Sequence, residues 1–167
     1  MRMKTTPSSI SDALKDAGLS VLACLQCGTC SGSCPSGRYT EMVTRKIVRD
    51  ARVGRDVLQD PDLWLCTTCY TCQERCPREI KIADAILAIR EIAVHEGIML
   101  PAHRKVSQLV LECGHAVPIN DVVKEKRERL GMDALPETVH KYPEALSEVQ
   151  TLLGRCGFDK LVAGSQE

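Results

Sequence analysis

Two cysteine runs with the same spacing constrain this chain more than any other feature of its sequence. Both follow the pattern C-x2-C-x2-C-x3-C-P, and the second begins 42 positions after the first. Three cysteines separated by two residues each can wrap one tight loop around a bound group. The fourth lies too far along the chain, and the following proline turns the backbone away. The cysteines are Cys24, Cys27, Cys30 and Cys34 in the first run and Cys66, Cys69, Cys72 and Cys76 in the second.

This spacing is typical of chains that bind two [4Fe-4S] clusters, in which the fourth cysteine of each run ligates the other cluster. The predicted ligands of cluster one are Cys24, Cys27, Cys30 and Cys76. The predicted ligands of cluster two are Cys66, Cys69, Cys72 and Cys34. Because this exchange ties the two halves of the chain together, we expect cluster loading to be coupled to folding.

Two other interpretations of the cysteines agree less well with the spacing. A structural zinc site uses pairs of ligands, and three cysteines so close together would crowd a tetrahedral ion. Disulfides are disfavoured because the chain has the features of a cytosolic protein, where thiols stay reduced. Its first residues contain no apolar segment of a secretory signal. No stretch approaches the roughly 18 uncharged apolar residues of a membrane span, so we expect a cytoplasmic protein.

The charge balance of the chain limits its partners. The sequence has 22 Lys and Arg residues against 22 Asp and Glu residues, and a zero balance disfavours a general polyanion binder. The segment 124–129 mixes both signs and lacks aromatic residues, so we expect no nucleic-acid binding. The sequence also lacks a nucleophile–base pair, a phosphate loop and a nucleotide fingerprint, which favours a chain that breaks no bond itself.

Outside the cysteine runs the pattern is helical almost throughout, without alternating strand segments, so the predicted fold class is all-α. A helical pattern follows each run, which indicates two similar halves related by a pseudo-two-fold axis. We expect one domain over residues 1–100 and a helical extension over residues 101–167, which packs on that domain or docks partners. The predicted helix starts are Ser9 or Ser11, Thr40, Asp60, Pro101, Asn120 and Pro143, and the predicted stops are Gly18, Gly54, Gly97, Gly114 and Gly131.

The segment between the runs, residues 35–65, has a helical pattern, unlike the strands of compact bacterial ferredoxins. In this the chain resembles the α-helical ferredoxin domain of the iron–sulfur subunits of succinate dehydrogenase and fumarate reductase. Three phrases narrow the resemblance: Cys27-Gly-Thr-Cys, Thr44-Arg-Lys-Ile and Asp62-Leu-Trp-Leu-Cys-Thr-Thr-Cys-Tyr-Thr-Cys-Gln-Glu-Arg-Cys-Pro. Over residues 20–100 the chain resembles the C subunits of the CoB–CoM heterodisulfide reductases of methanogenic archaea.

This resemblance implies a protein with two four-iron clusters and no substrate site. It implies electron transfer from a flavin-containing A subunit to a catalytic B subunit, which reduces the CoM-S-S-CoB disulfide in methanogenesis. It also implies association with a hydrogenase or formate dehydrogenase and participation in flavin-based electron bifurcation. The catalytic partner is marked by Cys-Cys-Gly motifs. This chain has no adjacent cysteines, so we expect the disulfide to be reduced on a partner.

Residues outside the runs carry weaker predictions. We expect Cys113 and Cys156 to be small hydrophobic residues on the apolar sides of helices. Trp64 is expected to pack over cluster two. A basic series is interpreted either as a solvated helix face or as charge that offsets the anionic clusters and guides a partner. Its members are Arg38, Arg45, Lys46, Arg49, Arg52 and Arg55, and no metal-binding role is expected of His95, His103, His115 and His140.

The two runs differ in the residues between their cysteines. The first has small residues such as Gly28 and Gly32, whereas the second has bulkier ones such as Tyr70. Hydrogen bonding and exposure set cluster potentials, so we expect unequal potentials, without an indication of which is lower. The favoured function is an electron-transfer subunit of an oxidoreductase complex. The alternatives are a relay subunit of a fumarate-reductase-like or sulfur-oxidation complex, and a zinc-held interaction module without redox function.

Overall fold

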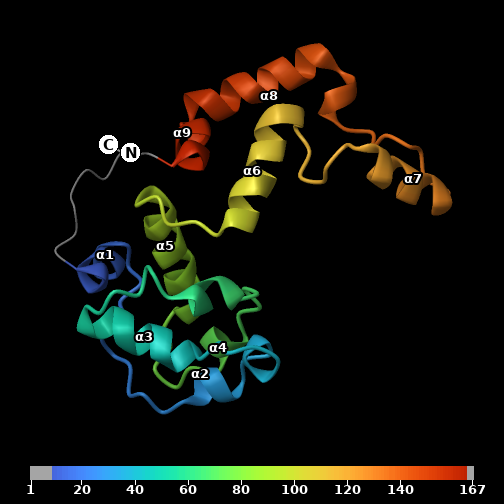
Figure 1. Ribbon diagram of the computed structural model, residues 1–167. Helices are drawn as coiled ribbons and strands as arrows, with labels where there is room; N and C mark the ends of the chain where they lie inside the picture. The colour runs from blue at the N-terminus through green and yellow to red at the C-terminus, as the bar shows by residue number, and fades with distance from the viewer. Residues whose placement is uncertain (1–8, 165–167) are drawn as a thin grey trace. The chain divides into compact units, whose positions relative to one another are not determined.

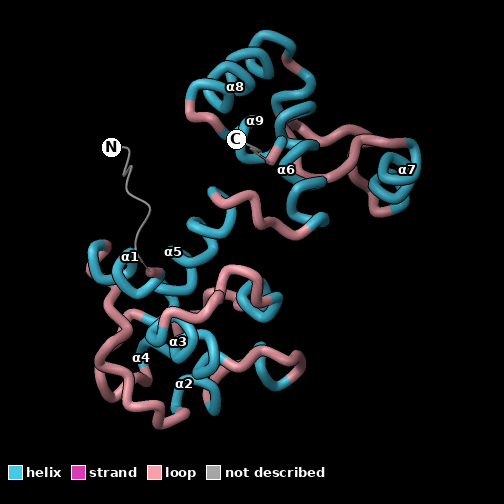
Figure 2. Tube along the Cα trace, turned by 60° about the vertical axis from the view of Figure 1, so that its left-hand side comes forward, coloured by secondary structure: helices cyan, strands magenta, loops and turns pink. Residues whose placement is uncertain are grey.

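The computed structural model of the chain describes residues 9–164, so the expectation about a signal segment lies outside the described residues. The chain divides into two compact units between Ile98 and Met99. Figures 1 and 2 show helices and loops in the described part, without strands. The all-α fold class is therefore confirmed. Each helix in this part is too short or too polar to cross a membrane.

The first unit places two short helices of the cysteine runs against each other. These are α2 (Thr29–Gly32) and α4 (Thr71–Glu74). Each also contacts the longer helix that follows its run, namely α3 (Thr44–Val53) or α5 (Ile82–His95). The N-terminal helix α1 (Ile10–Asp16) contacts both α3 and α5. This arrangement of matched pairs agrees with the two similar halves expected from the sequence.

The helix boundaries follow from side chains that cap them. The hydroxyl of Ser9 accepts a hydrogen bond from the Asp12 N–H, which begins α1 as predicted. Gly54 has a φ of 73° and ends α3, also as predicted. Asp60 caps the 3₁₀ turn η2 (Pro61–Leu65) by accepting from the Asp62 N–H.

The predicted start of a helix at Thr40 is wrong, because α3 begins at Thr44. The Thr40 hydroxyl instead donates to the Ser36 carbonyl, at the turn η1 (Ser36–Arg38). The first turn of α3 is capped from outside the helix. The hydroxyl of Ser31 accepts the Arg45 N–H at 2.8 Å, so a residue of the first cysteine run sets where α3 begins.

The core of the first unit is aliphatic. Leu14, Ile47, Leu63, Ile86 and Ile89 are among its fully buried side chains. Burial of each such side chain contributes roughly 1.5–3 kcal/mol. The buried members of the cysteine runs belong to the same packed cluster of residues, so the cysteine loops are held on the core and not on a detached surface segment.

The second unit has little buried apolar surface. Among the described residues of this unit, Val162 and Pro136 are buried, whereas Leu130 and Leu152 are 74% and 64% exposed. Helix α6 contacts both α8 and α9, and the predicted starts at Pro101, Asn120 and Pro143 are confirmed. The elements are α6 (Pro101–Cys113), α7 (Asp121–Arg129), η3 (Val139–Lys141), α8 (Pro143–Arg155) and α9 (Phe158–Ala163).

Candidate metal centres

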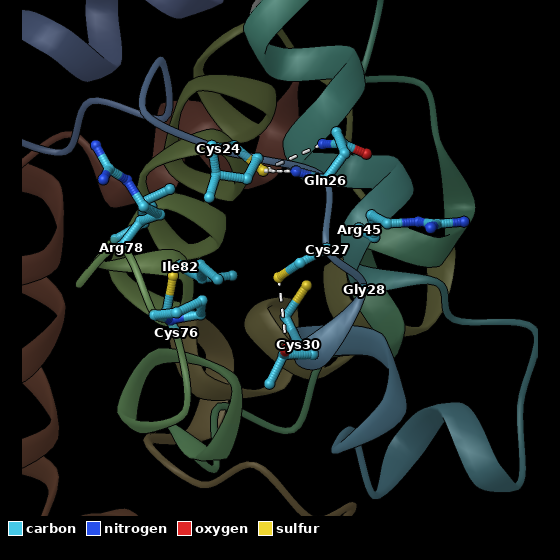
Figure 3. Close-up of a pocket in the computed structure, with 13 residues that line it drawn as sticks. Cys24, Gln26, Cys27, Gly28, Cys30, Arg45, Cys76, Arg78 and Ile82 are labelled. Carbon is cyan, nitrogen blue, oxygen red and sulfur yellow. Dashed lines mark hydrogen bonds between the residues drawn. The ribbon is translucent and has the colours of Figure 1, made fainter.

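The first cavity collects cysteines from both runs. Figure 3 shows Cys24, Cys27 and Cys30 around an open centre, with Cys76 on the opposite wall. The cavity has about 340 Å³ of empty volume, including its open mouth. The structure therefore brings together the four cysteines predicted for cluster one, including the one that comes from the other run.

The second cavity repeats this exchange. It is lined by Cys66, Cys69 and Cys72 of the second run and by Cys34 of the first. Its empty volume is about 300 Å³, again including its mouth. The four cysteines predicted for cluster two thus also share one cavity.

The two cysteine loops have the same backbone geometry. Gln26 and Thr68 have φ values of 58° and 51°, and they occupy equivalent positions two residues after the first cysteine. Because of this left-handed turn, the Gln26 N–H donates to Cys24 Sγ at 3.4 Å, and the Thr68 N–H donates to Cys66 Sγ at 3.4 Å. A hydrogen bond to a thiolate stabilises its charge. The left-handed backbone conformation therefore places an N–H donor against the first sulfur of each run.

The next equivalent pair is Gly28 and Tyr70, which also have positive φ values of 85° and 63°. Glycine adopts this conformation without strain, whereas a bulky residue does so at a cost of roughly 1 kcal/mol. Tyr70 has compensation, because its hydroxyl donates to Asp84 Oδ1 at 2.9 Å. This hydrogen bond raises the pKa of Tyr70 above its ordinary value.

A threonine lies two positions after the second cysteine of each run, and its hydroxyl contacts the sulfur of that cysteine. The distance from Cys27 Sγ to Thr29 Oγ1 is 3.4 Å, and that from Cys69 Sγ to Thr71 Oγ1 is 3.5 Å. These hydrogen bonds lower the pKa of the Cys27 and Cys69 thiols. Both cysteines are exposed, so each cavity has one readily ionised thiol at its solvent edge.

The third cysteine of each run is buried instead. Burial raises the pKa of the Cys30 thiol, and it raises the pKa of the Cys72 thiol to about 12. A metal ligand must be deprotonated. The thiols of Cys30 and Cys72 are therefore harder to ionise than those of Cys27 and Cys69, and a bound cationic core would favour their thiolate form.

An arginine holds the start of each run. Arg52 of α3 donates from Nη1 to the Cys24 carbonyl at 2.7 Å, and Arg90 of α5 donates from Nη2 to the Cys66 carbonyl at 2.7 Å. The second contact is the stronger one, because Arg90 is partly buried and also donates from Nε to the Leu63 carbonyl at 2.9 Å. Arg52 is exposed and makes the single contact. The two runs are therefore held by equivalent arginines, but the second run is held by more hydrogen bonds than the first.

The start of each long helix is likewise held by its own run. The Ser31 hydroxyl accepts the Arg45 N–H, as described above, and Gln73 Oε1 accepts the Ala83 N–H at 3.2 Å. Gln73 is fixed in turn, because its Nε2 donates to Asp84 Oδ2 at 3.2 Å. Capping of this kind fixes the entry of each helix against the cavity that it lines.

The walls of the two cavities differ in polarity. Arg45 and Arg78 line the first, and Gln26 Nε2 donates a further hydrogen bond to Cys24 Sγ at 3.2 Å. No charged side chain of the described residues lines the second cavity. Instead, Thr44 lies in its wall with 1% exposure, and its hydroxyl has no hydrogen-bond partner among the residues described.

The donor set fits a polynuclear cluster better than a single ion. Four cysteine sulfurs stand around each cavity, and thiolates are the ligands of [4Fe-4S] clusters. Within the described residues, His, Cys, Asp and Glu side chains are nowhere gathered in threes around one metal-ion position. Thr44 adds a buried hydroxyl without a partner, as expected where the wall faces a group rich in acceptor sulfurs.

Several predictions for other residues are wrong or need revision. Trp64 does not line the second cavity, because it packs under Arg90, whose guanidinium lies 5.7 Å from the ring centre. Cys156 is exposed at the end of α8 and is not a buried hydrophobic residue. Cys113 is partly buried, and its Sγ–H donates to the Leu109 carbonyl at 3.0 Å.

Three members of the basic series form ion pairs within the first unit. Lys46 pairs with Asp60 at 2.9 Å, and Arg49 pairs with Asp50 at 2.9 Å. Arg55 lies 3.6 Å from Asp50. Arg45, which lines the first cavity, is the member best placed to offset the charge of a cluster.

Sequence reasoning missed several residues that contact the cysteine loops or line their cavities. The contacts of Arg52 and Arg90 with the cysteine loops span 28 and 24 residues along the chain, and the role of Thr44 depends on burial, which no local pattern signals. The 42-residue offset of the two runs does not reveal the pair of arginines either, because Arg52 and Arg90 lie 38 residues apart. The missed residues include Gln26, Thr44 and Arg90, whereas Arg52 was expected as a member of the basic series but not as a partner of the Cys24 carbonyl.

Comparisons with known proteins agree with this geometry. Residues 20–80 match the 4Fe-4S dicluster domain family. The C subunit of the ferredoxin:CoB-CoM heterodisulfide reductase of Methanosarcina mazei is 64% identical over 151 residues, which cover 90% of this chain and 94% of the relative. The iron–sulfur C subunit of the CoB–CoM heterodisulfide reductase of Methanopyrus kandleri is 54% identical over 146 residues, which cover 86% of this chain and 76% of the relative.

A third relative matches the chain over its whole length. The C subunit of the H2:CoB-CoM heterodisulfide,ferredoxin reductase of Methanothermobacter marburgensis is 47% identical over 170 residues, which cover 100% of this chain and 92% of the relative. The similarity therefore extends through the second unit and is not confined to the cysteine runs. With two four-cysteine cavities on a helical scaffold and relatives this close, the chain belongs to the family of iron–sulfur C subunits of the CoB–CoM heterodisulfide reductases.

Proposed function

We propose that this chain relays electrons from a flavin-containing A subunit to a catalytic B subunit, which reduces the CoM-S-S-CoB disulfide. The observation that carries the proposal is the pair of cavities, each with four thiols drawn from both cysteine runs. We assign Cys24, Cys27, Cys30 and Cys76 as ligands of one [4Fe-4S] cluster. We assign Cys66, Cys69, Cys72 and Cys34 as ligands of the other.

Each cluster, when bound, supplies one-electron redox chemistry in which no bond of a substrate breaks. The residues of the chain hold, shield and polarise the bound groups. Cys30 and Cys72 lie buried on the protein side of their cavities, whereas Cys27 and Cys69 lie at the solvent edge. These exposed edges support the proposal, because a partner can approach each cavity there without rearrangement of the chain.

The second unit supports a role in assembly. Its exposed apolar side chains include Leu130, Met132, Tyr142 and Leu152, and exposed apolar surface is often an interaction site. We propose that this unit contributes to contacts with the other subunits. The larger complex would also contain a hydrogenase or a formate dehydrogenase. The names of the relatives differ in the donor, ferredoxin in one and H2 in another. The donor acts before this chain, so the relay itself does not depend on that difference.

Metal analysis tests the cluster assignment first. We expect anaerobically purified protein to contain about eight iron and eight sulfide per chain, as two [4Fe-4S] clusters require. Cys156→Ser is the matched control, because Cys156 is exposed and lies outside both cavities. It should keep full loading, whereas Cys69→Ser should lose iron and sulfide. Zinc without sulfide in the wild-type protein would refute the proposal.

A stoichiometric reoxidation tests the relay. The disulfide takes up two electrons and two protons to give two thiols, and a chain with two reduced clusters carries two electrons. We therefore expect one heterodisulfide to be consumed per fully reduced chain when the catalytic partner is present, and none when it is absent. Reduced chain that stays reduced in the presence of that partner and the disulfide would contradict the relay.

A further inference from the structure

The two cavities differ at one buried position of their walls, which has a hydroxyl group in the second cavity only. Thr44 is the first residue of α3 and lines the second cavity, and Ile82 is the first residue of α5 and lines the first. Both are almost completely buried, with 1% and 3% exposure. The two positions are equivalent in the repeat, because Met42 and Ile80 precede them by two residues and line the same respective cavities. One half therefore has a hydrogen-bond donor where the other has a hydrocarbon.

The hydroxyl of Thr44 is not used by the protein that surrounds it. Its oxygen is buried and has no hydrogen-bond partner within the described part of the chain. Helix capping does not account for it, because the first turn of α3 is capped by Ser31. A buried polar group without a partner is costly, and such groups are normally satisfied. The wall that Thr44 occupies faces four cysteine sulfurs.

We propose that the Thr44 hydroxyl donates a hydrogen bond to a sulfur of the cluster held by Cys34, Cys66, Cys69 and Cys72, and thereby raises the reduction potential of that cluster. This inference rests on the proposed function, since it requires a cluster in the second cavity. Reduction adds one negative charge to the cluster, and a donor aimed at its sulfur stabilises the reduced form more than the oxidised one. Ile82 provides no such donor in the first cavity.

The test is a redox titration of the complete chain with dithionite, followed by electron paramagnetic resonance. Thr44→Val removes the hydroxyl and keeps the branched shape of the side chain. We expect the reduction equilibrium of one cluster to become about tenfold less favourable, which lowers its midpoint potential by about 59 mV for one electron. Thr44→Ser keeps the donor and should retain the wild-type midpoint. Ile82→Val is the matched control and should leave both midpoints unchanged, because it removes no donor.

A variant of the other cavity identifies which midpoint belongs to which cluster. Gln26→Met removes the donor to Cys24 Sγ, so it should lower the midpoint that Thr44→Val leaves unchanged. A shift of the same midpoint by both variants would overturn the placement of Thr44 at the second cluster. If Thr44→Val fails to load its clusters, Thr44→Ala removes the same donor and should lower the same midpoint.

The outcomes separate this inference from the proposed function. Wild-type protein without two [4Fe-4S] clusters would refute the function and the inference together. Fully loaded Thr44→Val protein with both midpoints unchanged and an increased thermal midpoint would overturn the inference alone. That result would mean that the hydroxyl binds nothing and that its removal relieves a burial cost.

Discussion

Arg90 is the residue whose removal tests the architecture of the cysteine loops most directly. Its guanidinium joins two carbonyls near the start of the second run, those of Leu63 and Cys66, and lies over the Trp64 ring. Arg90→Met removes the charge and both hydrogen bonds but keeps a long apolar side chain. Arg52→Met is the natural comparison, because Arg52 makes the equivalent contact to Cys24 from an exposed position.

The magnitudes follow from the contacts. A hydrogen bond to a charged group contributes about 1.5–3 kcal/mol, and a cation–π contact adds about 0.5–1 kcal/mol. At the lower end of these ranges, two such bonds and the ring contact give about 3.5 kcal/mol for Arg90. The single exposed bond of Arg52 is more easily replaced by water, so about 0.5–1 kcal/mol is expected. In a unit of this size, 1 kcal/mol shifts the thermal midpoint by about 4–8 °C.

We therefore expect Arg90→Met to lower the thermal midpoint by about 15 °C and Arg52→Met by about 4 °C. The assay is anaerobic calorimetry of the loaded protein at one scan rate, with loss of cluster absorbance followed in parallel. Wild-type protein and both variants must first have equal iron content. Equal shifts for the two variants would refute the reasoning, because they would mean that burial and the second carbonyl add nothing.

Three further predictions address the crossing of the ligands, the turn beside it and the charge on α3. Cys76→Ala should abolish the resonance signal of the cluster in the first cavity, and Cys34→Ala that of the second, so each variant loses the cluster built mainly from the other run. Gly37→Ala should destabilise the loaded protein by about 1–3 kcal/mol in calorimetry, because its Cβ would lie 2.6 Å from a backbone oxygen, whereas Gly32→Ala, with open space, should be neutral or slightly stabilising. Hydrogen bonding from Arg49 lowers the pKa of Asp50, so the contribution of this carboxylate to stability is complete above about pH 4 and is lost as the pH falls through the lowered pKa. The difference in thermal midpoint between wild-type and Asp50→Asn protein should therefore shrink below about pH 4. A difference that stays constant with pH would count against this role of Asp50.

The sequence predicted well whatever depends on local spacing or on the chemistry of a residue type. The cysteine pattern implied which thiols share a cavity, because in two-cluster ferredoxins with this spacing the fourth cysteine of each run ligates the other cluster. Glycines at Gly54 and Gly114 marked helix ends, because both adopt positive φ values there. The low aromatic content of the chain, 3% of its residues, likewise agrees with the aliphatic core.

Predictions failed where a distant residue decided the outcome. Thr40 is a good capping residue, but the start of α3 depends on Ser31, which lies in the preceding cysteine run. Trp64 was placed over a cluster because it is near Cys66 in sequence, whereas its ring packs under Arg90 of α5. Cys156 was expected on the apolar side of a helix, whereas it follows the last residue of α8 and is exposed. None of these outcomes has a local signal, because each depends on how helices pack.

The exchange of the fourth cysteine has a consequence for how the protein is made. The first cavity is completed by Cys76, which is synthesised after the rest of the second run. A nascent chain that has exposed only the first run therefore has three of the four cysteines of the first cavity. With the ligand sets proposed above, neither site is complete until the second run has been synthesised. The crossing thus ties the completion of both sites to the same late segment of the chain.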